Sequence, residues 1–106
     1  MLKQATTLNG IIPIGKQVPG KFSLYQNFPN PFNPTTSIKF DIPKESIVKI
    51  TIFDALGRET AVPVNESLKA GSYSVDFDAS RLASGIYYYK IEAGNYIESK
   101  KMVLLK

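Results

Sequence analysis

The sequence contains no cysteine and no histidine. No disulfide can therefore stabilise the fold, and no thiol can serve as a nucleophile. The lack of histidine removes the commonest general base and a frequent metal ligand. Ser72 and Ser84 have no recognisable activating base in a nucleophile pattern, so serine-based hydrolysis is not indicated either. We therefore expect no enzyme activity, no catalytic residues, no metal site and no cofactor.

Long apolar segments are missing as well. The longest apolar runs, such as residues 102–105, are far shorter than the about 20 residues that a membrane-spanning helix needs. The first residues lack the pattern of a signal peptide, because Gln4 and Asn9 interrupt any hydrophobic region after the single charge of Lys3. We expect no membrane span, and an exported form would need a leader from a longer parent protein.

Length and composition are those of one small globular domain. The chain has 106 residues, of which 43% are hydrophobic and 21% charged, and its formal net charge is +4. A chain of this size can bury roughly two thirds of the surface that it exposes when unfolded. The lysines are scattered apart from Lys100 and Lys101, so no basic patch predicts a nucleic-acid partner.

The N-terminal segment has the composition of a linker, because glycine and proline recur there without a regular period. We interpret residues 1–21 as a linker or tether and residues 22–106 as the folded domain. Isoleucines at positions 11, 12 and 14 are unusual in a free linker. The alternative is therefore a short strand at this point that pairs with the edge of a sheet.

The rest of the chain shows an all-β pattern with turns at regular spacing. Apolar and polar residues alternate in 37–42 and 72–78, the segment 47–53 is rich in β-branched residues and 86–92 in aromatic ones, and Gly94-Asn95 is typical of a tight hairpin turn. The expected strands are 37–42, 47–53, 58–64, 72–78, 86–92 and 96–105. Pro63 marks the end of its strand as an edge, and a loop is expected over 65–71. Gly57 can take positive φ in the turn 54–57. With the isoleucine segment this makes about seven strands and no helix, which predicts an antiparallel β-sandwich.

Alternation also predicts which side chains face the core. Ile47 and Phe53 end the outer face of the strand 47–53, and we expect both to be covered. The last strand is apolar on both faces. We expect its inner face to carry Val103 and Leu105, and its outer face, open to a partner or to the tether, to carry Met102 and Leu104.

Residues 85–89 have the layout of the tyrosine corner of immunoglobulin domains. There a glycine lies two residues before the tyrosine and a cysteine two residues after it. Gly85 and Tyr87 fit this layout, while Tyr89 occupies the cysteine position, so packed side chains would replace the inter-sheet disulfide. We expect Tyr87, Tyr89 and Ile91 to face inward, with the Tyr87 hydroxyl bonded to a backbone carbonyl of the preceding loop. The fold class is therefore an immunoglobulin-like antiparallel β-sandwich.

Two groups of polar and aromatic residues allow more than one interpretation. Asp76 and Asp78 lie two apart on one strand face, where paired carboxylates can bind calcium or transfer protons. They also suit a solvent-facing position and a loop cap, respectively. Tyr88 and Tyr96 are the exposed candidates for a sugar-stacking platform, and their alternative role is to decorate the surface of the sheet.

The segment 24–36 is the most distinctive part of the chain, because three prolines and two asparagines alternate within six residues. Each proline fixes its own φ, removes a donor and pushes the preceding residue towards an extended conformation. This predicts a stiff, turned ribbon that is neither helix nor central strand. The ribbon could lock the start of the first strand, with Phe28 and Phe32 capping the sandwich, or act as a rigid recognition element that loses little entropy on docking.

Together these blocks resemble the type A C-terminal sorting domain of the type IX secretion system. The resemblance covers residues 24–34, 48–58, 70–73, 77–78, 82–87 and the closing block 101–106, in the order of the family. It implies recognition or motif roles for Asn27, Pro29, Asn30, Pro31, Phe32, Asn33, Pro34, Gly57, Gly71, Tyr73, Gly85, Tyr87, Lys101 and Lys106. Lysines on the last strand can also serve only to prevent edge-to-edge aggregation.

The resemblance implies a non-catalytic secretion signal on a longer exported protein. Its partners would be the type IX machinery, including the outer-membrane translocon and a surface sortase-like peptidase, and a cargo domain linked N-terminally. The protein would pass through the periplasm to the cell surface or the extracellular space, and the peptidase would cut upstream of Phe22. The alternative is a carbohydrate-binding or adhesive immunoglobulin-like module. Residues 48–57 and 70–87 are also similar to the immunoglobulin-like domain of flagellar hook-capping proteins, a pattern that leaves the proline block unexplained.

Overall fold

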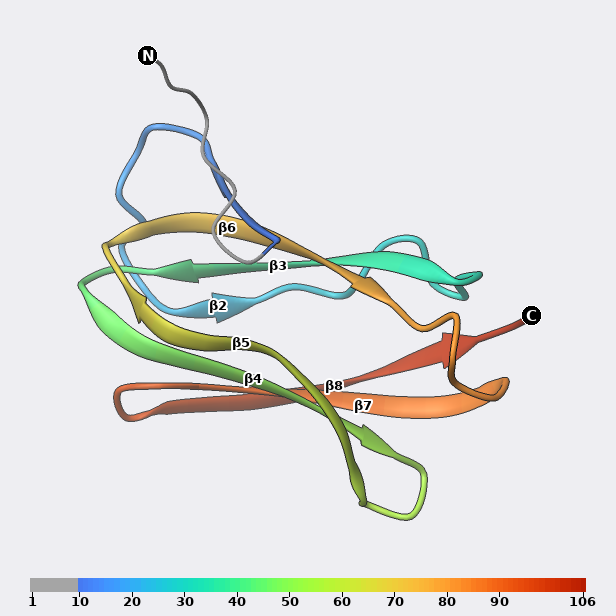
Figure 1. Ribbon diagram of the computed structural model, residues 1–106. Helices are drawn as coiled ribbons and strands as arrows, with labels where there is room; N and C mark the ends of the chain where they lie inside the picture. The colour runs from blue at the N-terminus through green and yellow to red at the C-terminus, as the bar shows by residue number, and fades with distance from the viewer. Residues whose placement is uncertain (1–9) are drawn as a thin grey trace.

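The computed structural model describes residues 10–106, and every regular element among them is a β-strand. Figure 1 shows two layers of strands facing each other. The eight strands are β1 (Ile11–Ile14), β2 (Ser23–Leu24), β3 (Thr35–Ile42), β4 (Ser46–Asp54), β5 (Glu59–Leu68), β6 (Gly71–Asp78), β7 (Gly85–Ala93) and β8 (Tyr96–Leu104). The all-β sandwich is confirmed, with eight strands instead of about seven because the two-residue β2 was not predicted.

The strands form two antiparallel sheets of four. The first has the order β1-β6-β3-β2 and the second the order β5-β4-β7-β8. If β2 is taken as strand A, the second sheet matches the order C′-C-F-G of immunoglobulin domains and the first matches D-E-B-A. The D position, however, is filled by β1 from the N-terminal segment and not by a strand between β5 and β6.

The predicted linker therefore contains a strand. Ile11–Ile14 pairs antiparallel with β6 over four residues, and Ile11 is buried in the core. Of the two interpretations of this segment, the strand that pairs with a sheet edge is the one that the structure shows (Figure 1). Residues 1–9 of the predicted tether lie outside the described residues.

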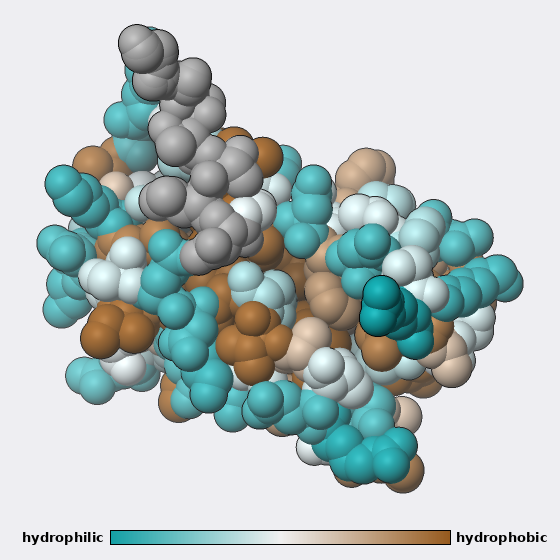
Figure 2. Space-filling view, viewed as in Figure 1, coloured by the Kyte–Doolittle hydropathy of each residue, from teal (hydrophilic) through white to brown (hydrophobic). Residues whose placement is uncertain are grey.

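The core lies between the two sheets and consists of the inward side chains of both. The inward positions of β3, β4, β6 and β7 are buried as alternation predicts, and the rings of Phe40 and Tyr73 stack with centroids 5.6 Å apart. Figure 2 shows apolar side chains along the middle of one face, with hydrophilic side chains around them. The predicted inward residues that are buried are Tyr73, Val75, Phe77, Tyr87, Tyr89 and Ile91.

The face assignment of the last strand was wrong. Met102 and Leu104 are fully buried, whereas Leu105 is 55% exposed and Val103 lies half-buried on the outer side. The two-residue turn at Gly94-Asn95 sets the register of the β7–β8 hairpin, which places Met102 opposite the inward Tyr87. Because both faces of this strand are apolar, composition alone could not choose between them.

Two expectations about the second sheet also fail. Ile47 was expected to be covered but is 70% exposed, because nothing packs on that end of the outer face. The predicted loop over 65–71 is strand up to Leu68, since β5 continues after an irregularity in its pairing with β4 between Ile50 and Ile52. Pro63 lies at this irregularity, which is where an edge strand tolerates a proline.

The inward and outward tyrosines of β7 give a direct test of the fold. Tyr87 is 7% exposed and its neighbour Tyr88 is 40% exposed. Replacing a buried aromatic residue by alanine costs about 3–5 kcal/mol, a large part of the about 5–15 kcal/mol that stabilises such a domain. We expect Tyr87→Ala to lower the free energy of unfolding in urea by about that amount, and Tyr88→Ala by far less. Equal losses for the two variants would show that the face assignment is wrong.

Candidate functional site

The proline ribbon, residues 26–34, passes from one sheet to the other at one end of the sandwich. Phe28 exchanges backbone hydrogen bonds of 3.0 and 2.9 Å with Ser37 on β3. Phe32 then forms a parallel bridge with Leu104 on β8, since its amide donates to Val103 and its carbonyl accepts from Leu105. The ribbon is thus hydrogen bonded to one strand of each sheet, β3 in the first and β8 in the second.

Polar side chains hold the turn of the ribbon from the inside. The buried Asn27 amide donates to the Pro29 carbonyl at 3.2 Å and to Thr36 Oγ1 at 3.0 Å. The Thr36 hydroxyl donates to the same Pro29 carbonyl at 2.8 Å. The peptide bonds before Pro29, Pro31 and Pro34 are cis. Asn27 is therefore a structural residue of the ribbon, with all of its side chain inside the turn.

Tyr89 joins the second sheet to the start of the ribbon. Its fully buried side chain extends from β7. The Tyr89 hydroxyl accepts a hydrogen bond from the backbone N–H of Asn27 at 2.8 Å and donates one to the backbone carbonyl of Tyr25 at 2.8 Å. Burial raises the pKa of Tyr89 to about 12. A buried tyrosine therefore occupies the position of the immunoglobulin cysteine, as the sequence predicted, but its hydrogen bonds to the chain at the start of the ribbon were not predicted.

The ribbon also covers the outer edge of the C-terminal strand. The Gln26 side-chain amide donates to the Lys101 carbonyl at 2.8 Å, and the Val103 amide donates to Asn30 Oδ1 at 2.9 Å. With the two bonds of Phe32, the backbone of β8 from Lys101 onwards is paired on its outer side. An edge strand left open would be a template for association with another chain.

The loop between β6 and β7 meets both the ribbon and the chain end. The Ala79 amide donates to the Pro34 carbonyl at 2.8 Å. The Lys106 ammonium donates to the Ser80 carbonyl at 2.6 Å, and the Lys106 amide donates to Ser84 Oγ at 3.0 Å. Three blocks that are far apart in the sequence, 26–34, 79–84 and 101–106, therefore form one surface, which we call the ribbon end. It lies on the right of Figure 1.

Phe28 and Phe32 play different parts, which corrects the expectation that both cap the sandwich. Phe32 is 2% exposed and belongs to the core, whereas Phe28 is 77% exposed. Residues directly opposite each other in a sheet point to the same face, and Phe28 lies opposite Ser37, on the outer face of β3. The ribbon thus presents Phe28 to solvent beside four further exposed motif residues, Pro29, Asn30, Pro31 and Asn33.

The predicted tyrosine corner is present, and a second one matches it. The Tyr87 hydroxyl donates to the Ala83 carbonyl at 2.7 Å, as expected. The Tyr73 hydroxyl donates to the Lys69 carbonyl, also four residues upstream, at 2.7 Å. Each tyrosine follows a glycine by two positions, and a Cβ on Gly71 would lie 3.5 Å from the Tyr73 ring. The repeated Gly-x-Tyr spacing could have revealed the second corner.

The remaining motif residues are divided between the two ends of the sandwich. Gly57 has φ of +82° in the turn that follows Asp54, and a pocket of about 230 Å³ separates this turn from Gly85. Backbone and side-chain hydrogen bonds from Arg58 lower the pKa of Asp54. Gly71 lies opposite Ile42 at the other end of the molecule, so Gly71 and Tyr73 are not part of the ribbon end.

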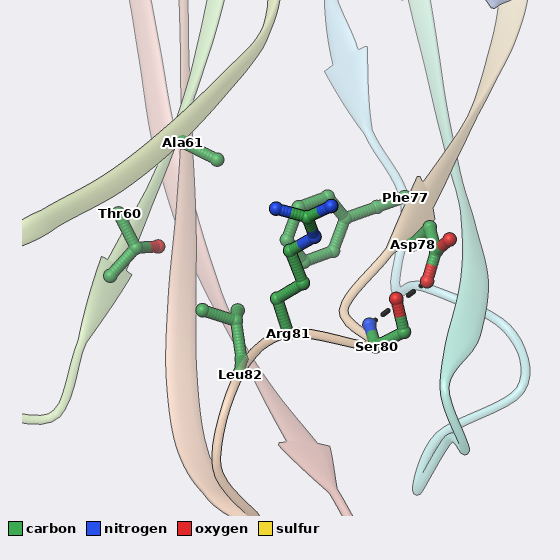
Figure 3. A pocket seen from close by; sticks show the side chains of 7 residues that line it. All are labelled: Thr60, Ala61, Phe77, Asp78, Ser80, Arg81 and Leu82. Carbon is green, nitrogen blue, oxygen red and sulfur yellow. Dashed lines mark hydrogen bonds between the residues drawn. The ribbon is translucent and has the colours of Figure 1, made fainter.

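A pocket of about 250 Å³ lies beside the loop at the ribbon end (Figure 3). Phe77, Leu82 and Ala61 contribute its apolar lining, and Arg81 and Asp78 contribute charge. The Asp78 carboxylate accepts from the Ser80 amide at 2.9 Å, which is the loop cap that the sequence predicted.

The candidate calcium ligands and the sugar platform find little support in the geometry. The Asp76 carboxylate accepts from the Ser37 hydroxyl at 2.7 Å, and within residues 10–106 no cluster of three acidic side chains could hold a metal ion. Tyr96 is half-buried and stacks on Phe22 with centroids 5.3 Å apart, contrary to its expected exposure. Tyr88 lies elsewhere, opposite Phe53 and Lys101, so the two tyrosines share no platform.

The fold is an immunoglobulin-like β-sandwich, and the ribbon end is its distinctive surface. A family model described as "Secretion system C-terminal sorting domain" matches residues 26–105. The match covers well over half of the 106 residues, and the chain belongs to this family. No curated protein and no solved structure matches it.

Membership of the family defines the role of the domain. It is a C-terminal sorting signal for the type IX secretion system, and the family is non-catalytic. This role implies the type IX machinery as partner, a cargo N-terminal to the domain, and export to the cell surface or the extracellular space. Over the described part of the chain, no helix could span a membrane.

The sequence analysis did not identify several residues that form hydrogen bonds within the ribbon end or to it. Gln26, Ser80 and Ser84 belong to the ribbon end, whereas Thr36 and Tyr89 bond to it from β3 and β7, and of these only Tyr89 was assigned to the core. Polar residues next to a proline-rich turn are a general signal for such side-chain–backbone bonds. Their partners, however, lie up to 75 positions away, so only the folded chain reveals them.

The buried Tyr89 hydroxyl predicts a loss of stability at high pH. Its pKa is about 12 in the folded protein, whereas an exposed tyrosine titrates near about 10. The contribution of neutral Tyr89 to the free energy of unfolding is thus complete below about pH 10. It declines between about pH 10 and about pH 12, because in this range the tyrosine ionises in the unfolded chain before it ionises in the folded protein. We expect Tyr89→Phe to flatten this decline in urea unfolding and to cost about 1–3 kcal/mol at neutral pH, because two backbone groups lose their partner. An unchanged alkaline slope would contradict the assignment.

Proposed function

We propose that the ribbon end is the surface by which the type IX machinery recognises this domain. One observation carries the proposal: the family blocks 26–34 and 101–106, which are distant in the sequence, are hydrogen bonded to each other and to the loop 79–84 in one exposed surface. Core packing requires Phe32, but it does not require the exposed Phe28 or the exposed prolines beside it. An exposed aromatic residue on a constrained backbone is typical of a binding hot spot.

The hydrogen bonds make the ribbon a preorganised ligand. Its backbone is tied to β3 through Phe28 and to β8 through Phe32, and Tyr89 ties its start to the core. A segment that is ordered before binding loses little conformational entropy when a partner docks on it. The two roles considered for the proline block, locking the start of the first strand and serving as a recognition element, are therefore compatible.

The finer steps of the secretion route belong to the same proposal. The domain follows its cargo into the periplasm, binds there, and directs passage through the outer-membrane translocon. A surface sortase-like peptidase then separates cargo and domain upstream of Phe22. The loop 15–21, which joins β1 to β2, is exposed at every position except Pro19 and would be open to such a cut. We propose Lys101 and Lys106 as contacts of the machinery, since both side chains are exposed.

A substitution of the exposed Phe28 can test recognition without disturbing the fold. In a leader-bearing reporter fused to this domain, we expect Phe28→Ser to reduce export roughly tenfold or more, as loss of a hot-spot aromatic residue does. The urea midpoint should stay close to that of the unmodified domain, because the side chain is 77% exposed. Ile47→Ser is the matched control, an exposed apolar residue at the opposite end, and should leave export unchanged. Normal export of the Phe28→Ser fusion would overturn the proposal.

The proposed role of Lys106 in recognition is tested by a point substitution and not by a deletion. Removing residues 102–106 would delete Met102 and Leu104, which are fully buried, so it would test folding. We expect Lys106→Ala to reduce export while changing the free energy of unfolding by less than about 0.5 kcal/mol, as for most surface positions. Lys44→Ala, an exposed lysine in the turn between β3 and β4, serves as the control. Equal export of both variants would remove Lys106 from the recognition surface.

A further inference from the structure

The strand β1 differs from the other strands in how it belongs to the domain. It lies outside the region 26–105 that defines the family, yet it fills the edge of β6 that a D strand covers in immunoglobulin domains. Among the strands of residues 10–106, β1 pairs only with β6, whereas β6 is also paired along all eight of its residues with β3. Taking β1 away would leave the pairing of every other strand intact and one edge of β6 open.

The contacts of β1 are those of a short peptide bound to a sheet edge. Its register runs from Ile11 opposite Val75 to Ile14 opposite Ser72. Ile11 is 1% exposed and enters the core, while the next residue, Ile12, is 39% exposed on the other face. Addition of an extended segment to a free edge, with backbone hydrogen bonds for affinity and alternate side-chain pockets for specificity, is a recurring mode of peptide recognition.

We propose that the outer edge of β6 is a binding site for an extended aliphatic peptide, and that residues 11–14 of this chain are its resident, detachable ligand. The connection 15–21 keeps this ligand at a high local concentration, because a short flexible link makes binding intramolecular. A cut in the connection removes this advantage. The segment then leaves, and the β6 edge becomes accessible to another strand of the same kind.

This site is independent of the ribbon end. Strand β1 contacts the first sheet at β6, whereas the ribbon contacts β3 and β8. Loss of recognition by the secretion machinery would leave the β6 edge unaffected, and the reverse also holds. The two proposals therefore fail separately.

The test uses the full chain with a specific protease sequence replacing residues 17–20 of the exposed connection. After cleavage, we expect the N-terminal fragment to separate from the domain in gel filtration at micromolar concentration. Amide exchange should rise in β6 and stay slow in β4. A synthetic peptide of residues 10–15 at millimolar concentration should restore the protection of β6. A fragment that stays bound on dilution, or an added peptide without effect, would overturn the proposal.

Two variants distinguish the edge site from general destabilisation. A peptide carrying Ile11→Asp should not restore protection, because this side chain enters the core, whereas one carrying Ile12→Asp should do so. In the uncut chain, Ile11→Asp should raise exchange in β6 alone. Unfolding of the whole domain by this substitution would show that β1 is an integral strand and would contradict the proposal.

Discussion

The crossing of the proline ribbon from β3 to β8 is the constraint on which the rest of this structure depends. A β-sandwich without a disulfide must keep two sheets in register by packing and hydrogen bonds alone. Here the backbone of Phe28 pairs with the first sheet, the backbone of Phe32 pairs with the second, and the Tyr89 hydroxyl bonds the start of the ribbon from the core side. Proline makes this path possible because it stiffens the chain and disfavours helix and central strand.

The same crossing brings the three segments of the ribbon end together. A ribbon that must reach β8 also meets the end of the chain, and Lys106 in turn bonds the loop that carries Ser80. The family blocks thus lie together because they are needed to close one end of the sandwich, and the exposed Phe28 lies on the surface that this closure creates. The surface that we propose for recognition is built from the segments that close the sandwich, so under this proposal recognition of the sorting signal depends on correct folding.

Two strand edges, one on β8 and one on β6, are covered by segments from the first part of the chain. Strand β8 would expose a row of unpaired backbone groups, and the ribbon covers it from Lys101 onwards. Strand β6 would expose another, and Ile11–Ile14 covers it. The two segments that cover these edges, β1 and the ribbon, both precede β3 in the chain. An uncovered edge is a template for association, which an exported domain must avoid during transit.

The sequence by itself determined the fold class, the inward faces of most strands, the tyrosine corner at Tyr87 and the family. Local alternation, glycine spacing and proline chemistry carry this information because they act over a few residues. The tertiary structure alone decided that Met102 faces the core, that Phe28 points to solvent and that the isoleucines at the start form a strand. Each of these depends on strand register or on a partner in another strand, as Phe28 does on Ser37, Met102 on Tyr87 and Ile11 on Val75. A strand that is apolar on both faces can turn either face to the core until its pairing register is set. A short apolar segment in a linker can be a strand or a loop until it has a neighbouring strand to pair with.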